Sequence, residues 1–133
     1  MSGNHSDKSS DNKIVAVQVL KSSEAWNGQH IDAYPQGEPE LTVMRLTIPA
    51  HSSLPWHTHP MPNACFILSG TLVVEDKETG EQQTFQAGEA LNETVNSAHR
   101  GFTLNTPAEL VITYAGVKGM ELTDPLPGEP EEF

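Results

Sequence analysis

The chain has 133 residues, enough for one domain with a buried core, and 36% of them are hydrophobic. The formal net charge is −11 with only seven Lys and Arg, which argues against nucleic acid or an anionic membrane as a partner, because both require clustered basic side chains. No apolar stretch approaches the ~20 residues of a transmembrane helix.

The two ends of the chain differ in composition from its middle. Residues 1–13 contain almost nothing that could be buried, and residues 119–133 carry five acids and three prolines without a base. Both are predicted to be tails, either mobile or draped over the body, which leaves residues 14–118 as a single domain. The N-terminus lacks an apolar signal-peptide core, so a cytoplasmic location is favoured; a periplasmic one stays open if a leader has been removed.

The segments predicted as strands are short and are rich in β-branched residues or alternate between apolar and polar ones. In chain order they are 13–20, 40–49, 63–75, 82–91 and 108–116. Turn-forming residues separate them, and residues 70–85 are typical of a hairpin whose loop lies at Lys77–Gly80. No helical periodicity is present. The pattern predicts an all-β sandwich or barrel.

Two histidines stand one residue apart in the segment PWHTHP, residues 55–60. Strand alternation puts His57 and His59 on the same face, about 7 Å apart along the chain, where two neutral imidazoles can bind one divalent ion. His99 follows the hairpin, which can bring it to the same place. Three nitrogen donors from two distant segments suffice for a mononuclear metal site. The spacing alone equally allows two surface histidines.

The stretch from 51 to 103 resembles the cupin superfamily, whose members are small double-stranded β-helix or jelly-roll barrels. The first motif of that family, G-x5-H-x-H-x3-E-x6-G, falls on His51, His57, His59, Asn63 and Gly70. The second, G-x5-P-x-G-x2-H-x3-N, falls on Gly88, Thr94, Asn96, His99 and Thr103. The resemblance therefore implies a single cupin barrel. Asn96 replaces a motif glycine and tolerates positive φ, so the turn there can survive.

The resemblance implies that the three motif histidines bind a divalent transition metal ion, with Fe, Mn, Ni and Zn as candidates. Asn63 stands where the family has its fourth ligand, a glutamate, and an amide oxygen is a weaker, uncharged donor. Either Asn63 completes the site weakly, or the site has three histidines and open positions, or another group completes it.

Glu93 is the nearest candidate for that other group, because an acid inside a barrel strand is costly unless it is paired or bound to metal. It could be a ligand or the general base of a reaction; alternatively it faces outward or is held by a donor such as Arg100. Cys65 lies two residues after Asn63 on the same inward face and is expected to be an apolar filler, with a thiolate or redox role as the alternative.

Two classes of function follow from this site. The first is a small metalloenzyme, foremost of the dioxygenase type, that acts on a small organic molecule and uses Glu93 for proton transfer. Since three neutral histidines leave the double charge of the ion uncompensated, an anionic ligand such as a small carboxylate is expected. The alternative is a non-catalytic module that binds a small molecule. The fold alone does not decide between them.

A homodimer is the expected assembly. A barrel of this size tends to leave a sheet face or an edge strand to be covered, and the apolar segment 13–20 is suited to be an exchanged or intermolecular strand.

Overall fold

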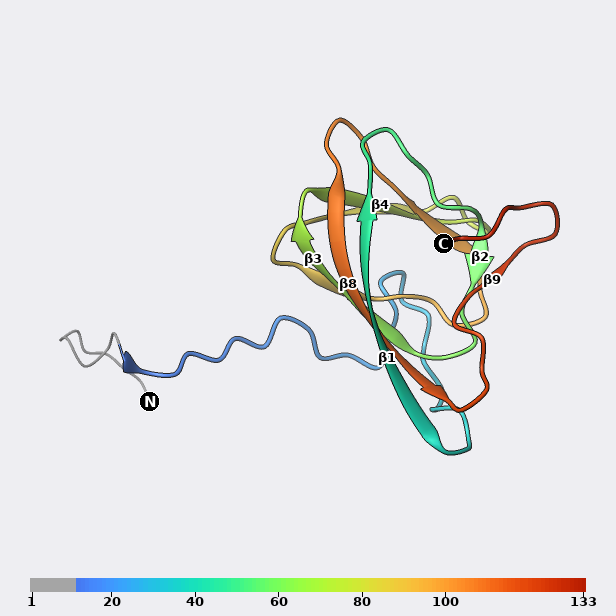
Figure 1. Ribbon diagram of the computed structural model, residues 1–133, viewed down its shortest axis with the longest axis horizontal. Helices are drawn as coiled ribbons and strands as arrows, with labels where there is room; N and C mark the ends of the chain where they lie inside the picture. Colours follow the sequence, from blue (N-terminus) through green and yellow to red (C-terminus); the bar gives the residue numbers. More distant parts are fainter. Residues whose placement is uncertain (1–11) are drawn as a thin grey trace.

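The computed structural model describes residues 12–133, and in that range the chain forms strands and no α-helix (Figure 1). The strands are β1 (Pro39–Ile48), β2 (His57–Thr58), β3 (Asn63–Ser69), β4 (Thr71–Asp76), β5 (Gln82–Gln86), β6 (Ala90–Asn92), β7 (His99–Phe102), β8 (Ala108–Val117) and β9 (Asp124–Pro125). No helix in this range is long and apolar enough to cross a membrane.

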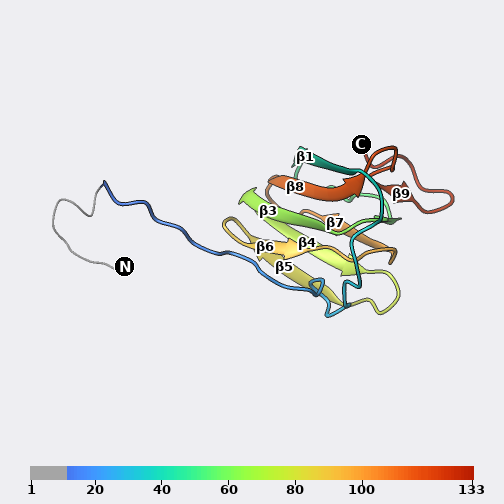
Figure 2. The same cartoon turned by 90° about the horizontal axis from the view of Figure 1, so that it is seen from below.

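The strands form two antiparallel sheets that pack face to face (Figure 2). One has the strand order β1-β8-β3-β6 and the other β5-β4-β7-β2-β9. Neighbours in the first sheet are far apart in sequence: β1 pairs with β8 along its whole length, and β8 pairs with β3. The all-β jelly-roll barrel predicted from the sequence is confirmed.

The core lies between the sheets and follows from strand alternation. In β8 every second side chain is buried, from Ala108 to Tyr114, and the residues between them face outward. The inward residues of β3 continue this layer with Cys65 and Ile67. The same alternation that fills the core therefore also sets which side chains of β3 and β8 point toward the barrel interior.

The predicted run 63–75 is divided at Gly70 into β3 and β4, which belong to different sheets. Gly70 has φ +80, and a Cβ atom there would lie 2.0 Å from the carbonyl oxygen of Pro107. Only glycine fits this turn. The predicted run 82–91 is likewise divided, into β5 and β6.

Two non-glycine residues in the described range have positive φ, His51 at 55° and Asn96 at 56°. Both stand at motif positions that the resembling family fills with glycine. The backbone therefore keeps the left-handed conformation at both positions although neither residue is glycine. For Asn96 this confirms the prediction, because asparagine tolerates positive φ.

The prediction of a strand at 13–20 is wrong for the chain taken alone. Residues 14–19 pair with no strand in the described part of the chain, and they lead away from the barrel (Figures 1 and 2). Ile14, Val15 and Val17 are 97%, 80% and 75% exposed. The segment has the apolar composition of a strand, but the described part of the chain offers it no neighbouring strand.

The C-terminal segment 119–133 lies across one end of the barrel. Its strand β9 pairs with β2, and the amide of Leu126 donates to the carbonyl oxygen of Trp56 at 3.0 Å. The division at residue 118 into a domain and a tail stays a prediction. Most of the predicted N-terminal tail, residues 1–11, lies outside the described residues.

Candidate metal centre

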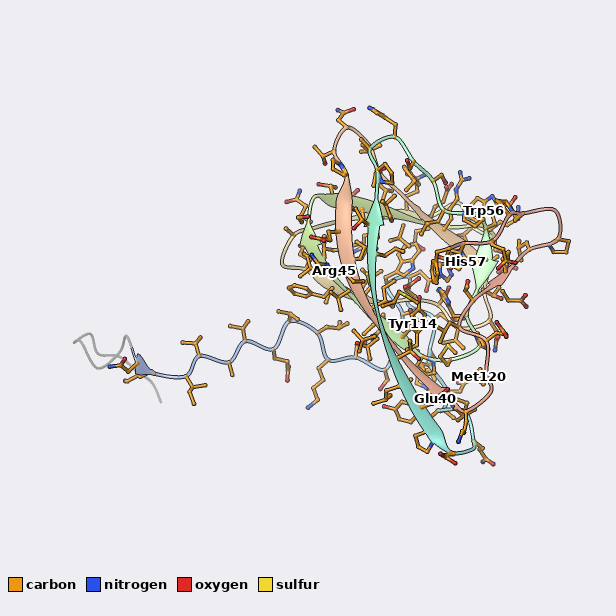
Figure 3. All side chains as sticks on the ribbon, in the orientation of Figure 1. Glu40, Arg45, Trp56, His57, Tyr114 and Met120 are labelled. Carbon is orange, nitrogen blue, oxygen red and sulfur yellow. The ribbon has the colours of Figure 1, made fainter. Side chains whose placement is uncertain are left out.

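The three motif histidines meet inside one end of the barrel, and each is only 1% exposed. His57 in β2 is paired in register with His99 in β7, and His59 follows two residues later. The ring centroids lie 4.7 Å apart for His57–His59, 4.5 Å for His57–His99 and 5.0 Å for His59–His99. Figure 3 places His57 next to Trp56, where β2 meets the C-terminal segment.

Glu93, directly after β6, joins the histidines in this cluster. Its Oε1 lies 2.8 Å from His99 Nε2 and 3.2 Å from His59 Nε2. One ligand atom from each of His57, His59, Glu93 and His99 lies within 4.8 Å of every other. Arg100, the alternative partner for Glu93, instead donates to Glu75 at 3.1 Å.

The outer nitrogen of each ring contacts an oxygen of the surrounding chain. His57 Nδ1 lies 2.7 Å from the carbonyl oxygen of Pro55, and His59 Nδ1 lies 2.9 Å from that of Leu122. His99 Nδ1 lies 3.0 Å from the carbonyl oxygen of Ser97 and 2.8 Å from Thr94 Oγ1, whose own proton goes to the same carbonyl. A carbonyl oxygen can only accept, so Nδ1 carries the proton in all three rings.

These bonds leave the Nε2 lone pairs facing the interior, where they meet the carboxylate of Glu93. Lone pairs and a carboxylate that converge without a donor repel one another, and a positive charge between them removes the repulsion. Outer hydrogen bonds that fix the imidazole tautomer are the usual support of histidine ligands. The cluster therefore fits a divalent metal ion.

The pKa shifts of the side chains in the cluster lead to the same conclusion. Burial, followed by the neighbouring His99 and His59 rings, lowers the pKa of His57 from 6.5 to about 4. Burial also acts to lower the pKa of His59, but the charge and hydrogen bond of Glu93 raise it above its ordinary value. Burial acts to raise the pKa of Glu93, while His59 and His99 hold it well below its usual range. Glu93 thus stays ionised and draws positive charge into the site.

Asn63 is buried, and its role as a weak ligand stays a prediction. Its Nδ2 donates to the carbonyl oxygen of Met61 at 3.2 Å, and its Oδ1 has no partner among the described residues. The amide of Glu93 donates to the carbonyl oxygen of Asn63 at 3.1 Å. The carboxylate of the cluster therefore comes from Glu93, directly after β6, whereas the resembling family carries it at the position of Asn63 in β3.

Glu132 is a residue of the site that the sequence analysis did not identify. Its side chain is 3% exposed, its Oε2 lies 3.2 Å from His57 Nε2, and Thr123 Oγ1 donates to its Oε1 at 2.6 Å. Burial raises the pKa of Glu132. An acid in an acidic, proline-rich tail looks like any solvated charge, so no signal in the sequence distinguishes it from Glu131.

A small, partly open cavity borders the cluster. His57, His99, Glu93 and Glu132 line one side, and the remaining wall is largely apolar, formed by Leu54, Cys65, Leu72, Val74, Leu91, Gly101, Leu110 and Ile112. It leaves about 20 Å³ to the centre of a water-sized molecule, which is space for about one water. Burial raises the pKa of the Cys65 thiol, so Cys65 forms part of the apolar wall as a neutral thiol.

Comparison with known proteins gives structural likeness only. No protein-family model and no curated protein matches the chain. DMSP lyase DddQ from Ruegeria pomeroyi is 21% identical with a TM-score of 0.59, over 68% of this chain and 45% of that one. A cupin-like protein from Thermotoga maritima is 13% identical with a TM-score of 0.56, over 65% and 64%. A predicted oxalate decarboxylase from the same organism is 23% identical with a TM-score of 0.50, over 56% and 65%.

The chain thus spans about half the length of the DddQ chain and less than two thirds of each Thermotoga protein. At these identities the likeness shows the fold: this chain is a small cupin barrel. Activity has to be argued from the site itself.

Proposed function

We propose that this chain is a metal-dependent enzyme that binds one divalent transition metal ion through His57, His59, His99 and Glu93 and acts on a small carboxylate. The observation that carries the proposal is the set of three histidines whose Nδ1 atoms are all tied to oxygen acceptors, which leaves their Nε2 atoms clustered with the ionised carboxylate of Glu93. Imidazole suits Fe, Ni and Zn, and carboxylate suits Mn, so all four ions are candidates.

The preference for a carboxylate follows from charge and space. Glu93 compensates one of the two charges of a divalent ion, so a second anion at the site is favoured. Away from the histidines and acids the wall of the cavity is largely apolar, so it favours a short carbon chain over further polar groups. Two structural neighbours, an oxalate oxidase in complex with glycolate and a predicted oxalate decarboxylase, are named for a small carboxylate.

The residues of the chain would contribute as follows. The carbonyl oxygens of Pro55, Leu122 and Ser97 orient the three rings, and the apolar wall excludes water. Glu93, whose Oε1 lies 2.8 Å from His99 Nε2, would be the candidate to accept a proton from a bound substrate. When bound, the ion would supply positive charge to polarise the substrate or, if it is iron, the redox chemistry of a dioxygenase.

The test is metal analysis by mass spectrometry on protein purified without added metal. We expect close to one equivalent of Fe, Mn, Ni or Zn, which the double variant His57→Ala/His59→Ala loses. His30→Ala is the matched control, because His30 is exposed and lies outside the cluster. Protein that refuses added metal, or a metal that remains in the double variant, would overturn the proposal.

Turnover is tested next, with the metal that the protein carries. Small carboxylates are offered with and without O₂, and their neutral methyl esters serve as controls. We expect turnover of an acid but not of its ester. One equivalent of metal without any turnover would favour the non-catalytic binding module instead.

We also propose that the protein is a homodimer. Residues 14–19 are apolar and exposed, and β1, the edge strand of the first sheet, exposes Leu41 and Val43 to 70% and 66%. An unpaired edge strand and an unpaired apolar segment are complementary between two copies related by a twofold axis.

A further inference from the structure

The final residues of the chain are held over the site by contacts around Trp56. The amide of Leu126 donates to the carbonyl oxygen of Trp56, and the amide of Trp56 donates to Glu129 Oε1, both at 3.0 Å. Thr123 Oγ1 donates to Glu132 Oε1 at 2.6 Å. Trp56 directly precedes the ligand candidate His57, so these bonds bring the end of the chain to the metal centre.

When Glu132 is ionised, its contact with His57 lacks a donor. The Nδ1 proton of His57 is directed at Pro55, so its Nε2 presents a lone pair to Glu132 Oε2 across 3.2 Å. Nε2 is buried and has no hydrogen-bond partner among the described residues. A carboxylate that is 3% exposed is costly to bury beside another acceptor. A cation between the two atoms would satisfy both.

Glu132 also takes up the space that a substrate would need. The cavity lined by His57, Glu93 and Glu132 has space for about one water-sized molecule. A small carboxylate cannot reach His57 while the Glu132 side chain is there. The carboxylate of the chain and a carboxylate from solution therefore compete for one position.

The end of the chain can leave without disturbing the barrel. β9 has two residues and pairs only with β2, and the segment beyond it is attached through the few bonds named above. Leu122, whose carbonyl oxygen orients His59, precedes β9. Residues 126–133 could thus lift away while the support of His59 stays in place.

We propose that Glu132 is a displaceable ligand of the metal centre, an internal carboxylate that a substrate carboxylate replaces when residues 126–133 lift from the barrel. This inference rests on the proposed function. The exchange of one carboxylate for another keeps the total charge of the site constant, whereas a neutral ester would leave the ion undercompensated. Glu132 therefore makes the site selective for anionic ligands, because only an anion replaces the charge of its carboxylate at the ion.

The test uses the full-length protein loaded with Co²⁺, whose visible absorption reports a change of ligand, titrated with acetate. Glu132→Gln removes the internal competitor, and Glu131→Gln is the matched control, since it makes the same charge change at an exposed neighbour. If the open form is about a tenth of the molecules, Glu132→Gln binds acetate about tenfold more tightly than wild type. Glu131→Gln should match wild type, and methyl acetate should leave all three spectra unchanged.

A second measurement follows the segment itself by hydrogen exchange. Acetate should accelerate exchange at residues 126–133 of the Co²⁺-loaded wild type, because it displaces the carboxylate that holds them. Equal acetate affinity in all three loaded proteins, or no acceleration at saturating acetate, overturns this proposal and leaves the proposed function intact. Failure of the wild type to bind Co²⁺ would overturn both.

Discussion

At the scale of single residues, the carboxylate of the cluster comes from a different strand from the one that carries it in the resembling family. Asn63 occupies the position at which the resembling family carries a glutamate, and Glu93 enters the cluster from the adjacent strand, one backbone hydrogen bond away. The cluster thus contains a carboxylate although the motif position for it holds Asn63. Glu93 and Asn63 therefore need to be tested separately.

Glu93→Gln should weaken metal binding by more than about 100-fold, the upper end of what the loss of an outer-shell partner costs. The amide keeps the shape of the side chain but removes the charge that His59 and His99 face. Competition with a chromophoric chelator measures the affinity. Glu75→Gln is the control, because Glu75 pairs with Arg100 outside the cluster. An unchanged affinity in Glu93→Gln would remove Glu93 from the ligand set.

The metal-free protein should lose stability as the solution becomes acidic. The pKa of His57 is lowered from 6.5 to about 4, so the unfolded chain takes up a proton that the folded chain refuses. Stability should fall by about 2 kcal/mol between about pH 6.5 and pH 5. The raised pKa of His59 affects stability in a different pH range. Its stabilising contribution is complete below pH 6.5 and is lost at higher pH.

Guanidinium unfolding in the presence of a chelator measures this slope. His57→Gln should flatten it, whereas the exposed His30→Gln should not. If the stability of His57→Gln depends on pH as steeply as that of wild type, the loss of stability in acid does not come from His57.

At the scale of elements, the turn at Gly70 decides how one apolar run becomes two strands in two sheets. A Cβ atom at Gly70 would lie 2.0 Å from the backbone oxygen of Pro107, while one at Gly80 would have nothing within 4 Å. The two glycines have nearly the same φ, +80 and +76. They therefore separate the effect of the contact from that of the backbone conformation.

Gly80→Ala should cost about 1 kcal/mol, because alanine is strained at positive φ. Gly70→Ala should cost about 3 kcal/mol or more, since the backbone must also move away from Pro107. Chemical unfolding of both variants gives the comparison. Equal losses of unfolding free energy in the two variants would mean that the backbone of the β3–β4 turn can move away from Pro107 without destabilising the barrel.

At the scale of the whole molecule, the two ends of the chain have different roles. The C-terminal segment supplies Glu132 to the cluster and the carbonyl oxygen of Leu122 to His59. The N-terminal segment 14–19 pairs with no strand in the described part of the chain and exposes Ile14, Val15 and Val17. One end completes the site of its own chain, and the other is available to a second copy.

Light scattering should give twice the 14.5 kDa mass of the chain. Val15→Asp/Val17→Asp should shift the protein to a monomer, because two charges on an apolar strand oppose its burial. Gln18→Asp is the control with a charge at a polar position of the same segment. A wild-type monomer, or a double variant that stays dimeric, would refute an interface built on residues 14–19.

The local pattern of the sequence was enough to predict an all-β chain, the hairpin loop at Lys77–Gly80, and three histidines that could meet, because alternation and turn chemistry depend on neighbouring residues. The tertiary structure decided what depends on distant ones. It brought Glu93 to the histidines, directed Arg100 to Glu75, placed Glu132 over His57, and left residues 14–19 without a strand to pair with. Such contacts depend on which strands become neighbours, and no local pattern of charge or hydrophobicity encodes that choice.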